Sequence, residues 1–205
     1  MKRRWQRLFV AAALSAGLLA CLRPAQAQEE PAKPPAKAGR PAPRGSVQNL
    51  DLLFQALKIA PDNTSAKAIS DRIWDVWLSS GGDTATLLMT RVRASIESKD
   101  YDLALQVLDG VIAFKPDYAE AWNQRATVYY LKKDYGRAMA DLAQALAREP
   151  RHFGALFGLG IILQEFGEER RALEVYRRVL ALDPHMQRVP DMVKTLSQKL
   201  EGRDI

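Results

Sequence analysis

The chain has 205 residues, of which 47% are hydrophobic and 26% are charged, and it contains one cysteine. Its formal net charge is +6, but five basic residues and no acidic residue lie in residues 1–27, so the remaining chain carries only +1. This balance argues against a nucleic-acid-binding protein, because such proteins neutralise many phosphates with Lys and Arg. A single cysteine excludes a disulfide within the chain.

Residues 1–27 have the parts of a secretory signal peptide. Four basic residues precede an apolar run at 8–22, and Ala25-Gln26-Ala27 follows as a small-x-small cleavage site. The run has about 15 residues, fewer than the roughly 20 that a membrane-spanning helix needs. We expect cleavage after Ala27 and a periplasmic or secreted protein with no membrane span.

Cys21 offers an alternative export route. Leu18-Leu19-Ala20-Cys21 loosely resembles the lipobox of bacterial lipoproteins, in which the cysteine becomes the lipidated first residue. The product would then be a membrane-anchored lipoprotein. We favour cleavage after Ala27, which removes Cys21 and leaves a chain without any thiol.

Two segments separate the signal peptide from the regular part of the chain. Residues 28–45 are rich in Pro and Ala and have little to bury, so they predict a disordered tether. Residues 46–84 show helical spacing of apolar residues and stop at Gly81-Gly82, which predicts a degenerate N-terminal pair of helices. Trp74 and Trp77 lie three residues apart there and are expected in the core rather than in a ligand-stacking pair.

A 34-residue interval runs through the rest of the sequence. Pro116, Pro150 and Pro184 keep it, as do three alanines, Ala104, Ala138 and Ala172. Lys99-Asp100-Tyr101 also recurs as Lys133-Asp134-Tyr135. Proline ends helices and alanine lets two helices approach closely, so the interval predicts three stacked helical hairpins.

The middle unit carries the residue types of a known helical repeat at their usual offsets. They are Trp122, Arg125, Ala126, Tyr129, Ala138, Leu142 and Pro150, with Arg125 replacing the usual Leu and Leu142 the usual aromatic residue. On these residues the chain resembles the tetratricopeptide repeat (TPR) family. The resemblance covers roughly residues 85–184 and implies an all-α fold, a short right-handed α-solenoid of helix-turn-helix units.

The resemblance also fixes the repeat boundaries. We expect repeats at 85–118, 119–152 and 153–186, followed by a capping helix at 187–205 that covers the apolar face of the last unit. An ordinary helical bundle with prolines in its loops is the alternative, but a bundle has no reason to keep a constant interval.

The family resemblance implies a protein–protein interaction scaffold that uses a groove formed by the first helix of each repeat. The implied groove residues are Met89, Arg93, Asn123, Thr127, Tyr130, Phe157, Ile161 and Gln164. Met89, Gly154 and Gly158 stand where the basic carboxylate clamp of chaperone-binding members needs Lys or Arg. We therefore expect an apolar partner segment, anchored by Phe157 and Ile161. The rival interpretation is that the C-terminal helix covers these two residues.

Two functional classes follow for the whole chain. The favoured one is an exported scaffold that binds a peptide or a helix of a cell-envelope partner. The second is a structural subunit or lipoprotein of a larger envelope assembly, of the outer-membrane or pilus biogenesis type. A stable stoichiometric complex on co-purification would favour the second class.

No pattern in the sequence supports catalysis. His152 and His185 follow helix-ending prolines, have no second ligand at a metal-binding spacing, and are interpreted as turn residues. No Gly-x-Ser-x-Gly motif occurs. We expect no catalytic residue, metal site or cofactor, which leaves a cell-wall hydrolase as a remote alternative.

Overall fold

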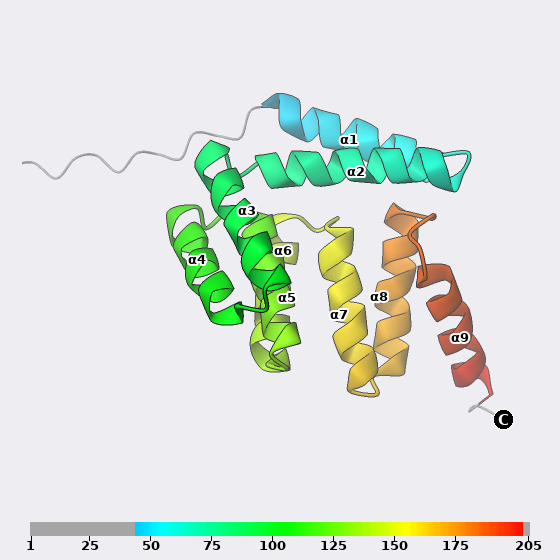
Figure 1. Cartoon of the computed structure of the whole chain (residues 1–205). Helices are drawn as coiled ribbons and strands as arrows, with labels where there is room; N and C mark the ends of the chain where they lie inside the picture. The colour runs from blue at the N-terminus through cyan, green and yellow to red at the C-terminus, as the bar shows by residue number, and fades with distance from the viewer. Residues whose placement is uncertain (1–43, 203–205) are drawn as a thin grey trace, which may run out of the picture. The chain divides into compact units, whose positions relative to one another are not determined.

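The computed structural model describes residues 44–202, and side chains from Asn49 onward. The predicted signal peptide, the alternative lipid site at Cys21 and nearly all of the predicted tether lie outside these residues. The described residues form helices and no strand, which confirms the all-α fold (Figure 1). The helices are α1 (Arg44–Lys58), α2 (Asn63–Ser79), α3 (Asp83–Glu97), α4 (Tyr101–Phe114), α5 (Ala119–Leu131), α6 (Tyr135–Arg148), α7 (Phe153–Glu165), α8 (Glu169–Leu182) and α9 (Val189–Glu201).

Three consecutive antiparallel pairs, α3 with α4, α5 with α6 and α7 with α8, form the repeats. The turn inside each pair contains one residue with a left-handed backbone: Lys99 at φ 61°, Lys133 at φ 59° and Gly167 at φ 74°. These positions keep the 34-residue interval. An aspartate caps the next helix in the first two turns: Asp100 accepts from the Leu103 N–H and Asp134 from the Arg137 N–H.

Small residues allow the helices of each pair to cross closely. Ala104, Ala138 and Ala172 are fully buried. A methyl group on Gly160 would overlap the ring of Tyr176, which is itself fully buried. The repeat register assigned from the sequence therefore places each small residue at a packed crossing.

Arg125 takes the place of an apolar residue in the middle repeat by forming a network of ion pairs. Its guanidinium group donates to both carboxylate oxygens of Asp141 at 2.7 and 2.8 Å, and to Asp109 at 2.7 Å. Asp141 is 5% exposed, so its ionised carboxylate is stabilised by the Arg125 guanidinium group. The network joins α4, α5 and α6 without the usual leucine.

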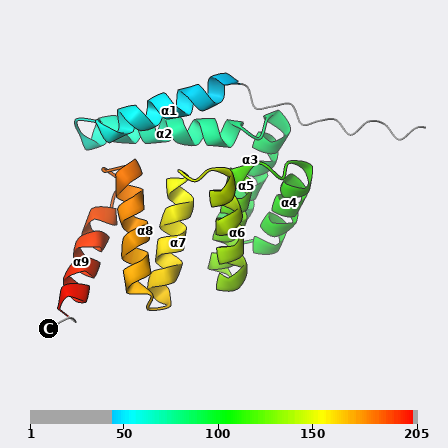
Figure 2. The ribbon, with the colours of Figure 1, turned by 180° about the vertical axis from the view of Figure 1, so that it is seen from behind.

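The N-terminal helices α1 and α2 form a hairpin, but it does not stack on α3 as a preceding repeat would. It crosses the ends of the later helices (Figures 1 and 2), and its closest polar contacts reach the loops before α7 and α9. Ser70 donates to Asp183 at 2.8 Å, and Arg151 donates to Asp51 at 2.5 Å. Phe54, Trp77 and Phe153 share one core with α8 and α9.

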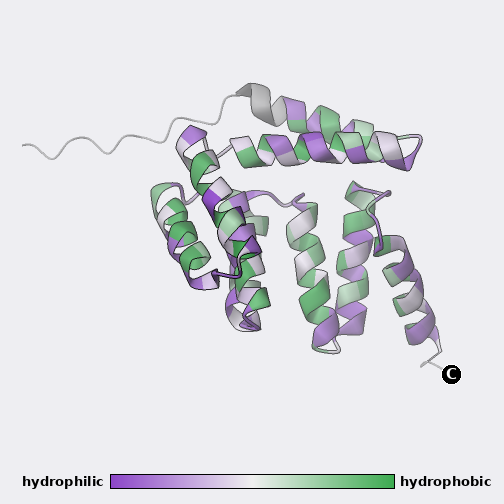
Figure 3. Cartoon of the chain, viewed as in Figure 1, coloured by the Kyte–Doolittle hydropathy of each residue, from purple (hydrophilic) through white to green (hydrophobic). Residues whose placement is uncertain are grey.

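Helix α7 buries six of its residues and carries no polar side chain before Gln164. Figure 3 shows it as largely hydrophobic along its length, whereas α9 mixes apolar and polar residues. Helix α9 packs on α8 and buries Val189 and Leu196. Between residues 44 and 202, no helix combines the length and apolarity of a membrane span.

Candidate functional site

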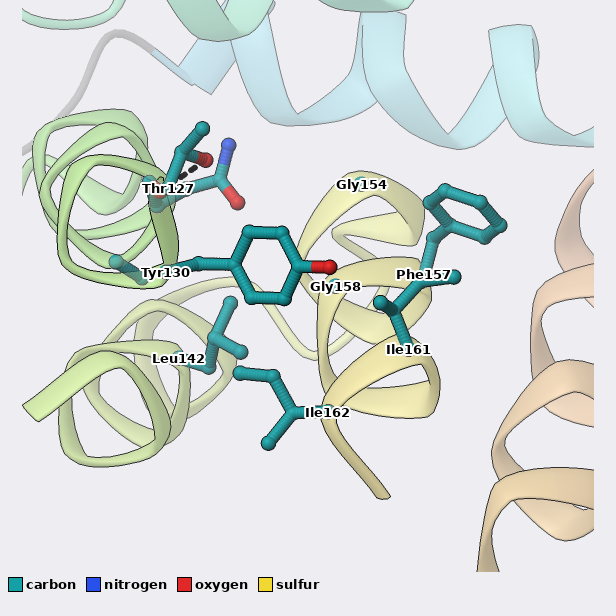
Figure 4. A pocket seen from close by; sticks show the side chains of 10 residues that line it. Thr127, Tyr130, Leu142, Gly154, Phe157, Gly158, Ile161 and Ile162 are labelled. Carbon is teal, nitrogen blue, oxygen red and sulfur yellow. Dashed lines mark hydrogen bonds between the residues drawn. The ribbon is translucent and has the colours of Figure 1, made fainter. Parts of the chain in front are cut away.

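A pocket of about 220 Å³ opens between α5 and α7, the first helices of the second and third repeats (Figure 4). We call it the α5–α7 pocket. Its lining is mainly apolar and comes from α5, α6 and α7: Asn123, Ala126, Thr127, Tyr130, Leu142, Gly154, Phe157, Gly158, Ile161 and Ile162. Figure 4 shows Tyr130 reaching from α5 toward α7 above Leu142 and Ile162.

Two glycines one turn apart on α7 shape the pocket. A methyl on Gly154 would lie 2.6 Å from the indole of Trp74, so helix α2 can approach α7 only because residue 154 has no side chain. A methyl on Gly158 would lie 3.5 Å from a Leu142 methyl, which is an ordinary contact. Gly154 is therefore required by packing, whereas Gly158 leaves space.

Asn123 is the most buried polar side chain of the lining, at 6% exposure. Its amide Nδ2 donates to Glu120 at 3.2 Å. Its Oδ1 accepts no hydrogen bond from any residue that the structure describes. The pocket wall is therefore mainly apolar, with Asn123, Thr127 and Tyr130 as its polar side chains.

Tyr130 is held in position by Glu165. The phenol donates to the Glu165 carboxylate at 2.6 Å, and this bond raises the pKa of Tyr130 to about 12. The same bond, with a second from Tyr135, lowers the pKa of Glu165, which therefore stays ionised at neutral pH. The ring of Tyr135 meets Phe166 edge-on at 5.4 Å, so aromatic groups continue beyond the pocket.

The structure divides the predicted groove residues among three hollows. Five of them line the α5–α7 pocket: Asn123, Thr127, Tyr130, Phe157 and Ile161. Met89 and Arg93 line a second hollow between α3 and α5, which also includes Thr127. Gln164 lies apart, in a hollow with α9, and accepts from the Tyr176 hydroxyl at 3.1 Å.

The C-terminal helix does not line the α5–α7 pocket. Phe157 and Ile161 are half-buried and remain part of the pocket wall. The ring of Phe157 leans toward α8, with its centroid 6.1 Å from that of Tyr176.

The sequence predicts that His152 is a turn residue, but the structure gives it a larger role. It lies in the turn before α7 but is fully buried, and its Nδ1 accepts from the Ala155 N–H at 3.1 Å. That bond places the ring proton on Nε2, which donates to the buried Glu120 at 2.9 Å. The ring stacks on Trp77 at 4.2 Å.

His185 likewise joins distant parts of the chain. Its ring nitrogens contact the Asn63 side chain at 2.7 Å and the Ala60 carbonyl at 3.1 Å.

The sequence contains one signal for the structural role of His152: this residue stands directly before an apolar helix, at the position of a helix-capping residue. No group of three or more metal-ligating side chains occurs in the described part of the chain.

Comparison with known proteins gives consistent matches. Two family models described as tetratricopeptide repeat match residues 89–143 and 129–189. A TPR repeat-containing protein of Rhizobium etli is 40% identical over 163 residues, covering 80% of each chain.

Solved structures share the fold at lower identity. The first TPR of Spaghetti (RPAP3), bound to an HSP90 peptide, superposes with a TM-score of 0.53 at 22% identity and covers 56% of this chain and 91% of its own. MamA superposes with a TM-score of 0.51 at 17% identity and covers 78% and 81%. At these identities the likeness concerns the fold alone.

Proposed function

Because the chain belongs to the tetratricopeptide repeat family, we propose that it is a protein–protein interaction scaffold whose α5–α7 pocket holds an apolar segment of a partner. The observation that carries the proposal is the lining of this pocket. It is open and apolar, lies on the first helices of two adjacent repeats, and contains no cationic side chain. Such a site favours apolar side chains over carboxylates.

The related fold that holds an HSP90 peptide supplies the comparison for a test. Its ligand, SRMEEVD, is acidic. We expect this chain to bind short apolar peptides and to bind the SRMEEVD peptide weakly or not at all. Fluorescence anisotropy with labelled peptides measures both affinities, and tighter binding of SRMEEVD would contradict the proposal.

Truncating the pocket wall tests which surface is used. Phe157→Ala and Ile161→Ala should each weaken binding of an apolar peptide by about 2 kcal/mol, the scale of a well-packed anchor. Leu87→Ala is the matched control, because Leu87 is 72% exposed and lies outside the pocket. If both pocket variants stay folded and bind as the wild type does, the surface assignment is wrong.

We also infer that the protein is exported and meets its partner in the cell envelope. The support is the sequence pattern of residues 1–27. Intact-mass measurement on envelope and periplasmic fractions distinguishes a chain beginning at Gln28 from a heavier, lipidated chain beginning at Cys21. A full-length mass in the cytosol contradicts export.

Affinity capture with the full-length protein then separates the two functional classes. An exchangeable partner that is lost in a Phe157→Ala/Ile161→Ala variant supports the scaffold. A stoichiometric complex that survives these changes supports the structural subunit of an envelope assembly.

A further inference from the structure

Helix α7 contains a glycine that packing does not explain. Glycine within a helix destabilises it by roughly 0.5–1 kcal/mol relative to alanine. Gly154 and Gly160 are accounted for, because a methyl at either position would overlap Trp74 or Tyr176. Gly158 is different, since an alanine there would only touch Leu142 at an ordinary distance. The helix would be more stable with alanine at 158, yet the glycine keeps the pocket open.

We propose that Gly158 forms the floor of a socket for one large apolar side chain, Leu, Met or Phe, of a partner segment whose flanking residues are basic. The inference rests on the proposed function and specifies its ligand. The volume is suitable: a dry cavity of about 150 Å³ holds benzene, and the α5–α7 pocket measures about 220 Å³.

Asn123 provides a hydrogen-bond acceptor for a ligand in the socket. Its side chain is more than nine-tenths buried, and its Oδ1 accepts no hydrogen bond from the described residues although it belongs to the pocket wall. Among the described residues only Trp77 Nε1 is both fully buried and without a partner, so Asn123 Oδ1 keeps access to the pocket opening and can accept a hydrogen bond from a ligand. A backbone N–H of the partner segment, next to its apolar anchor, is the complementary group.

Charge around the socket selects the flanking residues. Arg93 lines the hollow between α3 and α5 and a further hollow formed by α2, α3 and α5, and it is the only cation in either lining. The same linings contain Asp71, Asp75 and Glu97. Lys67 pairs with Asp71, but Asp75 and Glu97 have no ion-pair partner among the described residues. The ionised Glu165 lies at the Tyr130 end of the pocket. The surroundings therefore favour Lys or Arg over Asp or Glu on the partner.

A peptide series with one guest position tests the size of the socket. The probes are short synthetic peptides with Ala, Leu or Phe at the guest position and Lys on both sides, and a second set with Glu in place of Lys. We expect the Leu and Phe guests to bind the full-length protein at least about tenfold more tightly than the Ala guest. The Lys set should bind more tightly than the Glu set, with a difference that shrinks at high salt.

Gly158→Ala then tests direct contact. The added methyl should weaken binding of the Phe guest several-fold while leaving the Ala guest unchanged, and thermal stability should rise or stay the same. Gly110→Ala is the matched control: it lies within helix α4, has nothing within 4 Å of the added methyl, and should leave both peptide affinities unchanged.

Each outcome decides the inference. Equal affinity of the Phe guest for wild-type protein and Gly158→Ala overturns it, as does the absence of binding by every guest peptide at millimolar concentration. Preference for the Glu set overturns the charge assignment. If capture of an envelope partner still depends on Phe157 and Ile161 while Gly158→Ala has no effect, the scaffold function stands and only the socket fails.

Discussion

At the scale of single residues, the turn inside each repeat has a conformational free-energy cost that differs among the three repeats. The first two turns place lysine in a left-handed conformation, whereas the third uses glycine, which adopts it without a steric penalty. The geometry is the same in all three. The repeats therefore impose the backbone conformation, and the residue type only changes how much it costs.

Exchanging these residues should move stability in opposite directions. Lys133→Gly should raise the free energy of unfolding by up to about 1 kcal/mol, because it relieves the left-handed penalty. Gly167→Ala should lower it by about 1 kcal/mol, although nothing lies within 4 Å of the added methyl. Denaturant unfolding measures both. A stabilising Gly167→Ala would mean that the left-handed turn is absent in solution.

Ala138 tests the packing of the best-formed repeat. Ala138→Leu forces extra methylenes into a fully buried helix crossing and should cost roughly 1–3 kcal/mol. Ala140→Leu, on an exposed position of the same helix, is the control and should change stability little. Equal melting temperatures for the two variants would require the repeat register to be abandoned.

At the scale of helices, the ion-pair network of α4, α5 and α6 replaces an apolar contact. Arg125→Leu restores the residue typical of the repeat but leaves the buried Asp141 carboxylate without its partner. We expect a loss of about 3 kcal/mol. The double variant Arg125→Leu/Asp141→Leu should recover most of it, because it removes both charges.

Thermal unfolding of the wild type, the two single variants and the double variant, at moderate and high salt, measures the coupling between Arg125 and Asp141. Additive effects of the two single changes would contradict the proposed coupling.

At the scale of the whole described region, the α1–α2 hairpin shares its core with the last repeat and α9. Trp77 lies in the core shared by α1, α2, α7, α8 and α9, whereas α3 and α4 belong to another cluster. Trp77→Ala should cost about 3–5 kcal/mol. Hydrogen exchange should show lost amide protection in α7 and α8 as well as in the hairpin.

Phe114→Ala is the control for this experiment, since Phe114 is 64% exposed. Loss of protection confined to α1 and α2 would mean that the hairpin is an appendage rather than part of the core.

The repeats could be predicted because their contacts are local and periodic. The 34-residue interval identifies equivalent positions in adjacent repeats, and the burial of the three alanines is predicted from these positions. The hairpin could not be placed in this way, because Ser70 meets Asp183 and Asp51 meets Arg151 across more than ninety residues. Helical periodicity shows that a face is buried but does not identify what buries it. The open space at Gly158 depends on those same tertiary positions.

The hairpin also limits how many copies of the repeat the chain can hold. In a simple solenoid, units can be gained or lost, because each one contacts only its neighbours. Here Asn63 and Ser70 must reach the loop between α8 and α9, while Trp77 must reach the turn before α7. One additional repeat between them would carry those loops out of reach, and one fewer would remove the histidine on which Trp77 stacks. Helices α1 and α2 therefore restrict the number of repeats, and we expect homologues that retain these two helices to retain three repeats.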